Sequence, residues 1–226
     1  MTLSPTDRTT ITRHRERASD DRADLFAVLD EALVCHVGLV RDGAPIVLPS
    51  IFGVDPDGPD EGGTLYLHGS VAAPWLRQAP GATLCATFTL VDGAVVARAA
   101  FSHSMNYRSA VVMGPGRLVV DESERVHALD LIVDHVVPGR SATLRPHTRK
   151  ELAATVVIAV PLAEASVKAR VGGPVDEADD IAAGVWAGVV PLSVTAGVIE
   201  PDGEGPVPDD VLHRVAAGWG AASAAG

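Results

Sequence analysis

The sequence predicts a mainly β protein in which antiparallel sheets are accompanied by a few peripheral helices. Short runs rich in β-branched residues are separated by glycine-containing turns, the pattern expected of strands. Several such runs precede one helical segment and another run follows it, which fits antiparallel sheets better than strict alternation of strand and helix. The length of 226 residues favours one domain.

The chain begins with polar residues of mixed charge, and we expect residues 1–22 to form an arm over the domain or over a partner subunit. Leu25, Phe26 and Leu29 follow at helical spacing after an acidic start, which predicts a short amphipathic helix over residues 23–32. We expect the domain itself to span residues 23–200. A linker and a tail then occupy residues 201–226.

A meander of three strands is expected after this helix. The apolar runs 33–40 and 45–54 are joined through Asp42-Gly43, a strong hairpin signal because glycine accepts the positive φ of tight turns. A cluster of Gly, Asp and Pro separates them from the third strand, residues 64–70. Residues 72–78 then suit one or two helical turns.

The second half of the chain is predicted to hold further strands around one helix. Residues 82–120 are interpreted as strands broken at Asp92-Gly93 and again at residues 114–116. Apolar spacing over residues 123–136 predicts a helix that Pro138-Gly139 ends. We expect one long strand over residues 151–170, an acidic glycine-rich loop, an extended segment at 185–194, and a short tail helix that starts at an Asp cap.

Composition excludes several partners. The chain has 18 Lys+Arg against 29 Asp+Glu, a formal charge of −11, which repels nucleic acid and anionic lipid while leaving room for a small anion at a local cation cluster.

Cys35 and Cys85 lie in apolar runs without zinc or disulfide spacing, so we expect neither a metal site nor a disulfide. The N-terminus lacks a signal-peptide core and no stretch approaches about 20 apolar residues, which predicts a cytoplasmic protein.

The most informative stretch runs from His103 to Gly114, where polar side chains interrupt a strand-like pattern. Buried polar groups need partners. The guanidinium of Arg108 and the hydroxyls of Ser104 and Ser109 suit the oxygens of a phosphate, and Tyr107 can stack or donate. A network between strands or subunits is the alternative explanation.

A second group is the strand end His68-Gly69-Ser70. Glycine permits close backbone approach and serine can cap or bind an anion, although a lone histidine at a strand end is more often structural.

Three segments, LPSIFGV (48–54), LYLHGS (65–70) and FSHSMNYRSAVVMG (101–114), resemble the flavin-nucleotide-binding branch of the pyridoxamine 5′-phosphate oxidase-like proteins. Nitroimidazole-resistance proteins belong to the same broad group. The segments DHVVPGR, VKAR and WAGVVP add supporting matches, and the resemblance covers about residues 27–191. It implies a split β-barrel that forms a homodimer and holds FMN in a groove at the subunit interface.

The resemblance also assigns residues. It implies that Arg108 and Ser109 contact the FMN phosphate and that backbone at residues 49–51 lines the isoalloxazine ring. Lys168 and Arg170, which precede Gly172-Gly173, are two further cations for a phosphate or substrate, with a solvated pair on a strand edge as the alternative. The cofactor-binding residues expected in this way are Pro49, Ser50, Ile51, His68, Gly69, Ser70, Ser104, Asn106, Tyr107, Arg108, Ser109 and Lys168.

The chain lacks the Arg-x-x-x-Leu-Lys motif of a true pyridoxamine phosphate oxidase, which argues against vitamin B6 synthesis. Relatives with this barrel also bind a deazaflavin coenzyme or haem, so both stay open as cofactors, with His68 or His103 as an axial haem ligand.

The resulting hypothesis is an FMN-dependent oxidoreductase acting on a small organic substrate. The flavin carries the redox chemistry, and His68 or His103 serves as the catalytic residue that orients substrate or delivers a proton. A non-catalytic flavin- or haem-binding sensor is the first alternative. A barrel that has lost its cofactor and serves as an interaction protein is the second.

Overall fold

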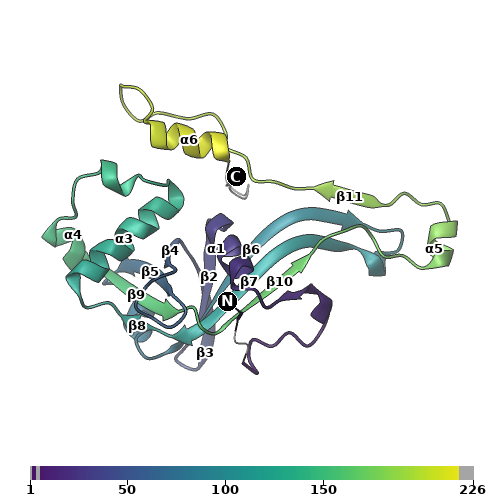
Figure 1. The fold of residues 1–226 in the computed structure, drawn as a ribbon, viewed down its shortest axis with the longest axis horizontal. Coiled ribbons are helices and arrows are strands. Elements are labelled where there is room, and N and C mark those ends of the chain that lie inside the picture. Colours follow the sequence, from purple (N-terminus) through teal and green to yellow (C-terminus); the bar gives the residue numbers. More distant parts are fainter. Residues whose placement is uncertain (1, 4–5, 219–226) are drawn as a thin grey trace.

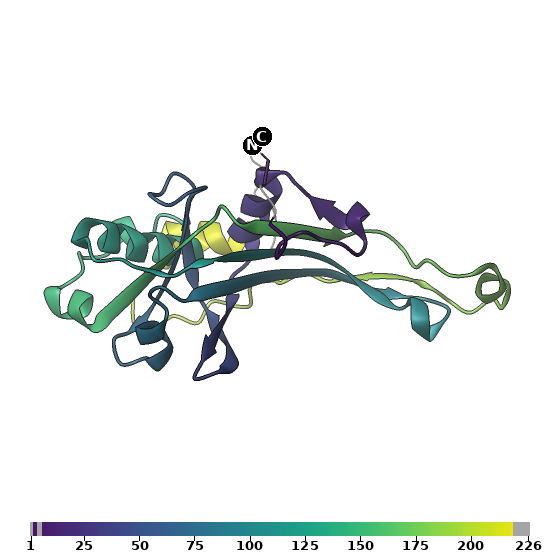
Figure 2. The same cartoon turned by 90° about the horizontal axis from the view of Figure 1, so that it is seen from below.

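The computed structural model describes residues 2–3 and 6–218. Two antiparallel sheets form its body, and one end of the larger sheet projects well beyond that body (Figures 1 and 2). Within the described residues the larger sheet has the strand order β1-β10-β7-β6-β2-β3, and β11 pairs with β6. Its strands are β1 (Ala18–Ser19), β2 (Cys35–Arg41), β3 (Ala44–Ser50), β6 (Thr83–Val96), β7 (Ser104–Pro115), β10 (Ala165–Arg170) and β11 (Gly188–Pro191).

The smaller sheet has the order β4-β5-β9-β8, and α3 packs against its strand β4. Its strands are β4 (Phe52–Asp55), β5 (Thr64–Ser70), β8 (Arg117–Leu118) and β9 (Thr155–Pro161). The helices are α1 (Arg22–Glu31), α2 (Pro74–Gln78), α3 (Glu122–Val136), α4 (Arg149–Ala154), α5 (Ala178–Ala182) and α6 (Asp209–Ala217), with short 3₁₀ turns η1 (Arg15–Arg17), η2 (Ala100–Ser102) and η3 (Ser141–Thr143). The prediction of a mainly β fold with peripheral helices is confirmed.

Local sequence signals explain where the helices begin. The side chain of Asp21 accepts a hydrogen bond from Ala23 N at the start of α1, and that of Asp121 accepts from Glu124 N at the start of α3. Both helices, and the short α2, were predicted. None of the helices in the described part of the chain is long and apolar enough to cross a membrane.

The predicted hairpin at Asp42-Gly43 joins β2 to β3. Both residues have positive φ, 51° and 80°, as a two-residue hairpin turn requires. β3 is the edge strand of the larger sheet and carries two prolines, Pro45 and Pro49.

Several sequence predictions were wrong. Residues 45–54 do not form the middle strand of a meander: the run divides at Ile51 into β3 of the larger sheet and β4 of the smaller sheet, and β5 pairs with β4 rather than with β3. The predicted acidic loop contains the short helix α5. Asp92-Gly93 does not break a strand: β6 runs through it as 14 residues paired to β7, and the extra residue is absorbed as a register shift between Val91 and Gly93. Residues 151–170 do not form one strand. Pro161, which cannot extend a hydrogen-bonded ladder, ends β9, and the chain then crosses to the other sheet as β10. The tail helix α6 begins after Pro208, without a side-chain cap from an aspartate.

The core lies between α1, the inner face of the larger sheet and the smaller sheet. Phe52 of β4 and Phe88 of β6 meet edge to face with ring centroids 4.8 Å apart, and both are fully buried. His135 of α3 packs on Phe52 at 4.3 Å and donates from Nε2 to the carbonyl of Ala32 at 2.7 Å. These contacts tie α3 to the end of α1.

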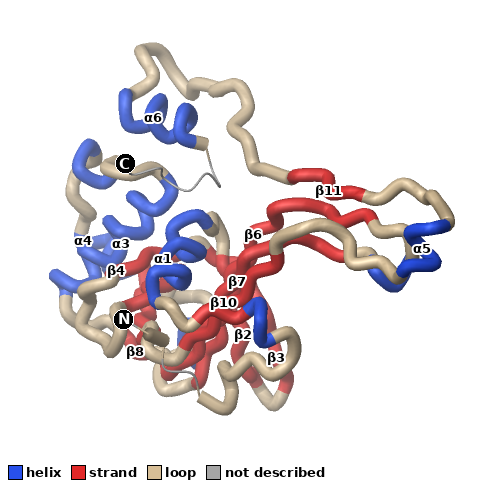
Figure 3. The backbone as a smooth tube through the Cα atoms, turned by 45° about the vertical axis from the view of Figure 1, so that its right-hand side comes forward, coloured by secondary structure: helices blue, strands red, loops and turns tan. Residues whose placement is uncertain are grey.

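The face of the larger sheet turned away from α1, here called the open face, is not covered in the described chain. One row of paired residues crosses it from β10 to β3: Ser166, Val111, Thr87, His36 and Pro49. Val40 and Val47 on the same face are 68% and 63% exposed. The division into an arm of residues 1–22, a domain of residues 23–200 and a tail of residues 201–226 stays a prediction. α6 lies at the same end as α3 and is joined to β11 by an extended segment (Figure 3).

Candidate functional site

The structure separates the predicted site residues into three places. His103, Ser104, Tyr107, Ser109 and Lys168 lie on β7, β10 and the turn before β7. The residues Pro49, Ser50, Ile51, His68, Gly69 and Ser70 gather where β3 passes into β4 beside β5. Asn106 and Arg108 also belong to β7, but their side chains lie away from these two groups: Asn106 accepts from Arg170, and Arg108 donates to Glu31 and Asp92.

The corner formed by residues 49–51 and 68–70 is brought together by strand register. Phe52 pairs with Leu67, which places Ile51 one step along the ladder, beside His68. Burial lowers the pKa of His68, so its ring is neutral near pH 7, and its Nδ1 is buried without a hydrogen-bond partner in the described part of the chain. Gly69 has a structural role, because a Cβ there would stand 2.7 Å from Cδ1 of Leu76 in α2.

Arg108 lies on the α1 side of the sheet, away from Tyr107 and Ser109. Its Nη1 donates to Glu31 at 2.6 Å, and its Nε and Nη2 donate to the two oxygens of Asp92 at 3.1 and 2.8 Å. These carboxylates raise the pKa of Arg108 and already neutralise its charge. A phosphate at the same place would be repelled by Glu31 and Asp92, so this geometry does not support Arg108 as its anchor.

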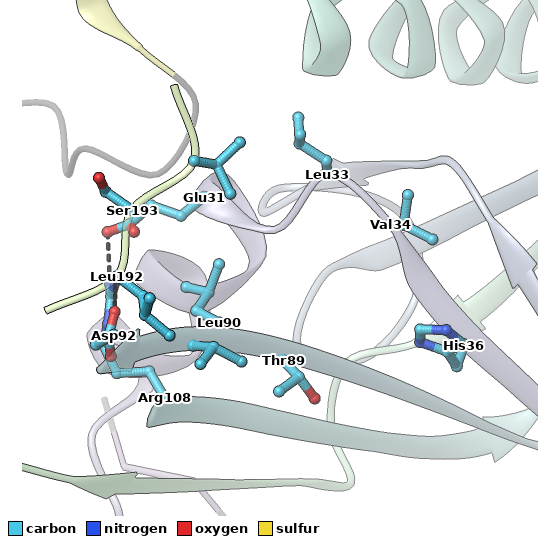
Figure 4. Close-up of a pocket in the computed structure, with 12 residues that line it drawn as sticks. Glu31, Leu33, Val34, His36, Thr89, Leu90, Asp92, Arg108, Leu192 and Ser193 are labelled. Atoms are coloured by element: carbon cyan, nitrogen blue, oxygen red, sulfur yellow. Dashed lines mark hydrogen bonds and ion pairs between the residues drawn. The ribbon is translucent and has the colours of Figure 1, made fainter. Parts of the chain in front are cut away.

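A slot of about 320 Å³ opens beside this ion-pair group (Figure 4). β2 pairs with β6 at residues 85–88 and β11 pairs with it at residues 93–96, so residues 89–91 have no strand partner on that edge. Glu31, Asp92 and Arg108 lie together at one end of the slot and His36 lies at the other (Figure 4). Apolar side chains from the connection between α1 and β2, from β6 and from the segment after β11 form most of the remaining wall.

A second cavity, of about 540 Å³, lies under the N-terminal arm and is here called the basic pocket. It is lined by Arg13, His14, Arg17, Phe101, Ser102, His103, Ser104, Tyr107, Lys168, Arg170 and Val175. No aspartate or glutamate is among these residues. In a chain with a formal charge of −11, such a grouping makes a local field of the opposite sign.

The cations of the basic pocket are held in place mainly by uncharged groups. Arg170 donates to Asn106 Oδ1 at 2.5 Å and to the carbonyls of Gly172 and Gly173 at 3.1 and 2.9 Å. Lys168 Nζ donates to the carbonyl of Arg13 at 3.1 Å. Asn106 thus orients a cation of the pocket rather than lining it.

His103 stands at the rim of the basic pocket and is exposed. Its Nδ1 lies 3.0 Å from the carbonyl of Ala99, and donation of that bond assigns the tautomer in which Nε2 is free. A histidine held in this way can accept a proton or coordinate a metal through Nε2. His68 lines neither the slot nor the basic pocket.

Sequence reasoning missed Arg13, His14 and Arg17, whereas Arg170 was expected beside Lys168. The three missed residues reach the pocket because β1 pairs with β10, with Ala18 opposite Lys168. A two-residue strand carries no sequence pattern. The cluster of charges in the arm was visible, but its position was not.

Two antiparallel sheets with peripheral helices define the class of split β-barrels. The chain belongs to the pyridoxamine 5′-phosphate oxidase family, whose model matches residues 21–169. The family predicted from the motifs is therefore confirmed. A search of curated protein sequences found no match.

Solved structures give closer likenesses. The flavocytochrome Anf3 of Azotobacter vinelandii is 35% identical with a TM-score of 0.84, over 93% of this chain and 98% of that one. An FAD- and haem-binding protein of Mycobacterium smegmatis is 41% identical with a TM-score of 0.79, over 87% and 96%. A putative 5-nitroimidazole antibiotic resistance protein of Bacteroides thetaiotaomicron is 26% identical with a TM-score of 0.53, over 67% and 85%.

Proposed function

We propose that the protein is a homodimeric, flavin-dependent redox protein whose flavin ring lies on the open face of the larger sheet. The observation that carries the proposal is the continuity of that face with the basic pocket: Val91 pairs with Tyr107, and Thr89 pairs with Ser109, which pairs with Lys168. A flat, largely apolar ring can lie on the strands while an anionic tail reaches the cations. The flavin, when bound, supplies the hydride and electron chemistry.

The flavin proposed is FAD rather than FMN. The relative from Mycobacterium smegmatis binds FAD and is 41% identical to this chain. The sequence motifs alone had favoured FMN, and the deazaflavin coenzyme has no support in these likenesses.

The chain's own residues have distinct roles in this proposal. The hydroxyls of Thr87 and Thr89 lie on the open face and can donate to the polar edge of a ring. The hydroxyl of Ser109 donates to the carbonyl of Lys168 at 3.2 Å and can accept from the ring. The Nε2 atom of His103 is free to bond a substrate at the rim of the basic pocket, and Tyr107 stands between the face and the pocket. His68 has a structural role in the corner formed by residues 49–51 and 68–70.

A second subunit completes the site in this proposal. Val40 and Val47 are more than 60% exposed beside the row at Thr87 and His36, and a ring bound to an uncovered sheet face would keep one side in water. Covering the face with a second copy buries both the valines and the ring. The projecting end of the larger sheet, built from β6 and β7, extends beyond the body, where it is available to the partner subunit (Figure 2).

The test is uptake of flavin by the purified protein, followed by absorbance, with Thr87→Trp as the variant and Val120→Trp as the control. Val120 is 78% exposed and lies in the connection between β8 of the smaller sheet and α3. We expect the wild type and the control to take up FAD stoichiometrically and Thr87→Trp to fail while retaining its circular dichroism. Normal uptake by Thr87→Trp would place the ring elsewhere. Light scattering measures the dimer, and a monomer that binds FAD at micromolar concentration would refute the second subunit.

If flavin is taken up, nicotinamide donors and nitro or quinone acceptors are the first substrates to screen. Reduction of the bound flavin by a donor, followed by reoxidation by an acceptor, would establish catalysis. Uptake without turnover by any pair would favour a flavin carrier.

Haem is the second candidate group. Two of the similar structures are a flavocytochrome and an FAD- and haem-binding protein, and His103 presents Nε2 as a haem ligand requires. We expect a Soret band on titration with hemin that is lost in His103→Ala and kept in His127→Ala, whose ring bonds to Asp55 on the smaller sheet. A Soret band that is unchanged in His103→Ala would exclude His103 as the ligand.

A further inference from the structure

Cations of this acidic chain are commonly paired with carboxylates. Ion pairs of 2.5–3.4 Å join Arg8 to Glu164, Arg98 to Asp176, Arg108 to Glu31 and Asp92, Arg117 to Asp60 and Glu124, Arg140 to Asp210, and Arg145 to Glu151. The basic pocket departs from this pattern, because Arg13, Lys168 and Arg170 line it without a carboxylate partner among the described residues.

The carboxylates nearest in sequence do not neutralise the pocket. Asp176 is 1% exposed and bonds to Arg98 at 3.0 Å. Glu16 is 67% exposed, bonds to His14, and lies 3.7 Å from Nε of Arg17. Positive charge therefore accumulates at one place, and it attracts an anion that carries more than one negative charge.

Two aromatic rings flank these cations. Phe101 lies at the rim with 99% of its surface exposed, and Tyr107 lies on the open face. An apolar ring with no packing partner is suited to stacking on a planar base, which is how aromatic side chains hold nucleobases. Cations and stacking rings together match a nucleotide better than an isolated phosphate.

We propose that the basic pocket is a dinucleotide site, in which the diphosphate lies between Lys168 and the arm residues Arg13 and Arg17, with the adenine stacked on Phe101. The pocket then selects dinucleotides over mononucleotides. The diphosphate belongs either to FAD or to a nicotinamide dinucleotide that donates electrons. The assignment of the diphosphate to FAD rests on the proposed function, whereas the inference that the basic pocket binds a dinucleotide does not.

The N-terminal arm is a working part of this site. Arg13 lies shortly before η1 and Arg17 is its last residue. The arm is fixed by the pairing of β1 with β10 and by the bond from Lys168 Nζ to the Arg13 carbonyl. The same lysine thus holds the arm and faces the pocket. A ligand that draws on Lys168 also orders the arm over itself.

The test is calorimetric titration of the full chain with FAD, FMN, NADPH, inorganic pyrophosphate and hemin. Lys168→Ala and the double variant Arg13→Ala/Arg17→Ala remove pocket cations. Arg15→Ala is the matched control, because Arg15 lies in the same arm but does not line the pocket. Loss of a charge-assisted contact weakens binding by roughly 10-fold or more, and we expect this for a dinucleotide in both pocket variants. Arg15→Ala should bind as the wild type does.

The outcomes distinguish FAD from a nicotinamide dinucleotide as the source of the diphosphate, and they distinguish failure of this inference from failure of the proposed function. Weaker binding of FAD with FMN little changed assigns the diphosphate to FAD, and weaker binding of NADPH alone assigns it to the electron donor. If the wild type takes up FAD and both pocket variants bind FAD and NADPH as tightly, the inference is overturned and the proposed function stands. If the wild type binds no flavin but binds NADPH through these cations, the proposed function fails and the pocket stands. Weaker binding of hemin alone would make it a site for haem propionates and overturn the inference.

Discussion

Replacing Arg108 with alanine removes the cation that Glu31 and Asp92 share. The Glu31 side chain is 6% exposed, so the variant leaves a buried carboxylate without its charge partner. Breaking a buried ion pair costs about 3–5 kcal/mol, and we expect about 3 kcal/mol here since water reaches the partly exposed guanidinium. In a protein of this size 1 kcal/mol shifts Tm by about 2–4 °C, which gives a decrease of about 6–12 °C.

Thermal unfolding followed by circular dichroism at pH 7 measures this decrease. The double variant Glu31→Ala/Arg108→Ala should recover part of the loss, because it removes the stranded charge as well. Arg145→Ala is the control: Arg145 bonds to Glu151 at 2.5 Å, but both side chains are largely exposed, so Tm should hardly change. An unchanged Tm in Arg108→Ala together with weaker flavin binding would refute this reasoning and restore Arg108 as a cofactor ligand.

Two further predictions concern α3. Burial lowers the pKa of His135 below its ordinary value of about 6.5, so its contribution to stability is present above that pH and is lost as the pH falls toward the folded pKa. His135→Gln, which keeps a donor for the Ala32 carbonyl, should flatten the decline of Tm between pH 7 and pH 5, and an identical slope would contradict this. A Cβ at Gly53 would lie 2.9 Å from the backbone nitrogen of Ile132. Gly53→Ala should therefore lower the free energy of unfolding in urea by about 1–3 kcal/mol, against no change for Gly197→Ala in open space, and equal values would contradict the packing argument.

Short-range chemistry explains the parts of the fold that the sequence predicts well. Asp42-Gly43 specifies its own turn, and the spacing over residues 123–136 specifies the apolar face of α3. Asp92-Gly93 carries the same local signal as Asp42-Gly43 but lies inside β6, because pairing with β7 continues on both sides of it. Local sequence cannot distinguish a turn from a bulge when the neighbouring strand decides.

The candidate site shows the same limit. Side chains alternate between the two faces of a strand, so Tyr107 and Ser109 lie on one face of β7 and Arg108 lies on the other. Strand geometry alone therefore argues against a phosphate site built from these adjacent residues. The carboxylates that hold Arg108 come from α1 and from the bulge in β6. The basic pocket combines Lys168 and Arg170 of β10 with Arg13, His14 and Arg17 of an arm about 150 residues earlier in the chain, and only tertiary structure brings them together.

The two prolines of β3 determine how the larger sheet can meet another molecule. An edge strand normally offers a row of N–H donors to any passing strand, but Pro45 and Pro49 offer none, so a further strand cannot continue the ladder there. Growth by adding strand to strand, which has no natural stopping point, is discouraged. Contact through the flat side of the sheet remains, and such contact between two copies is self-limiting because each copy has only one such side to give.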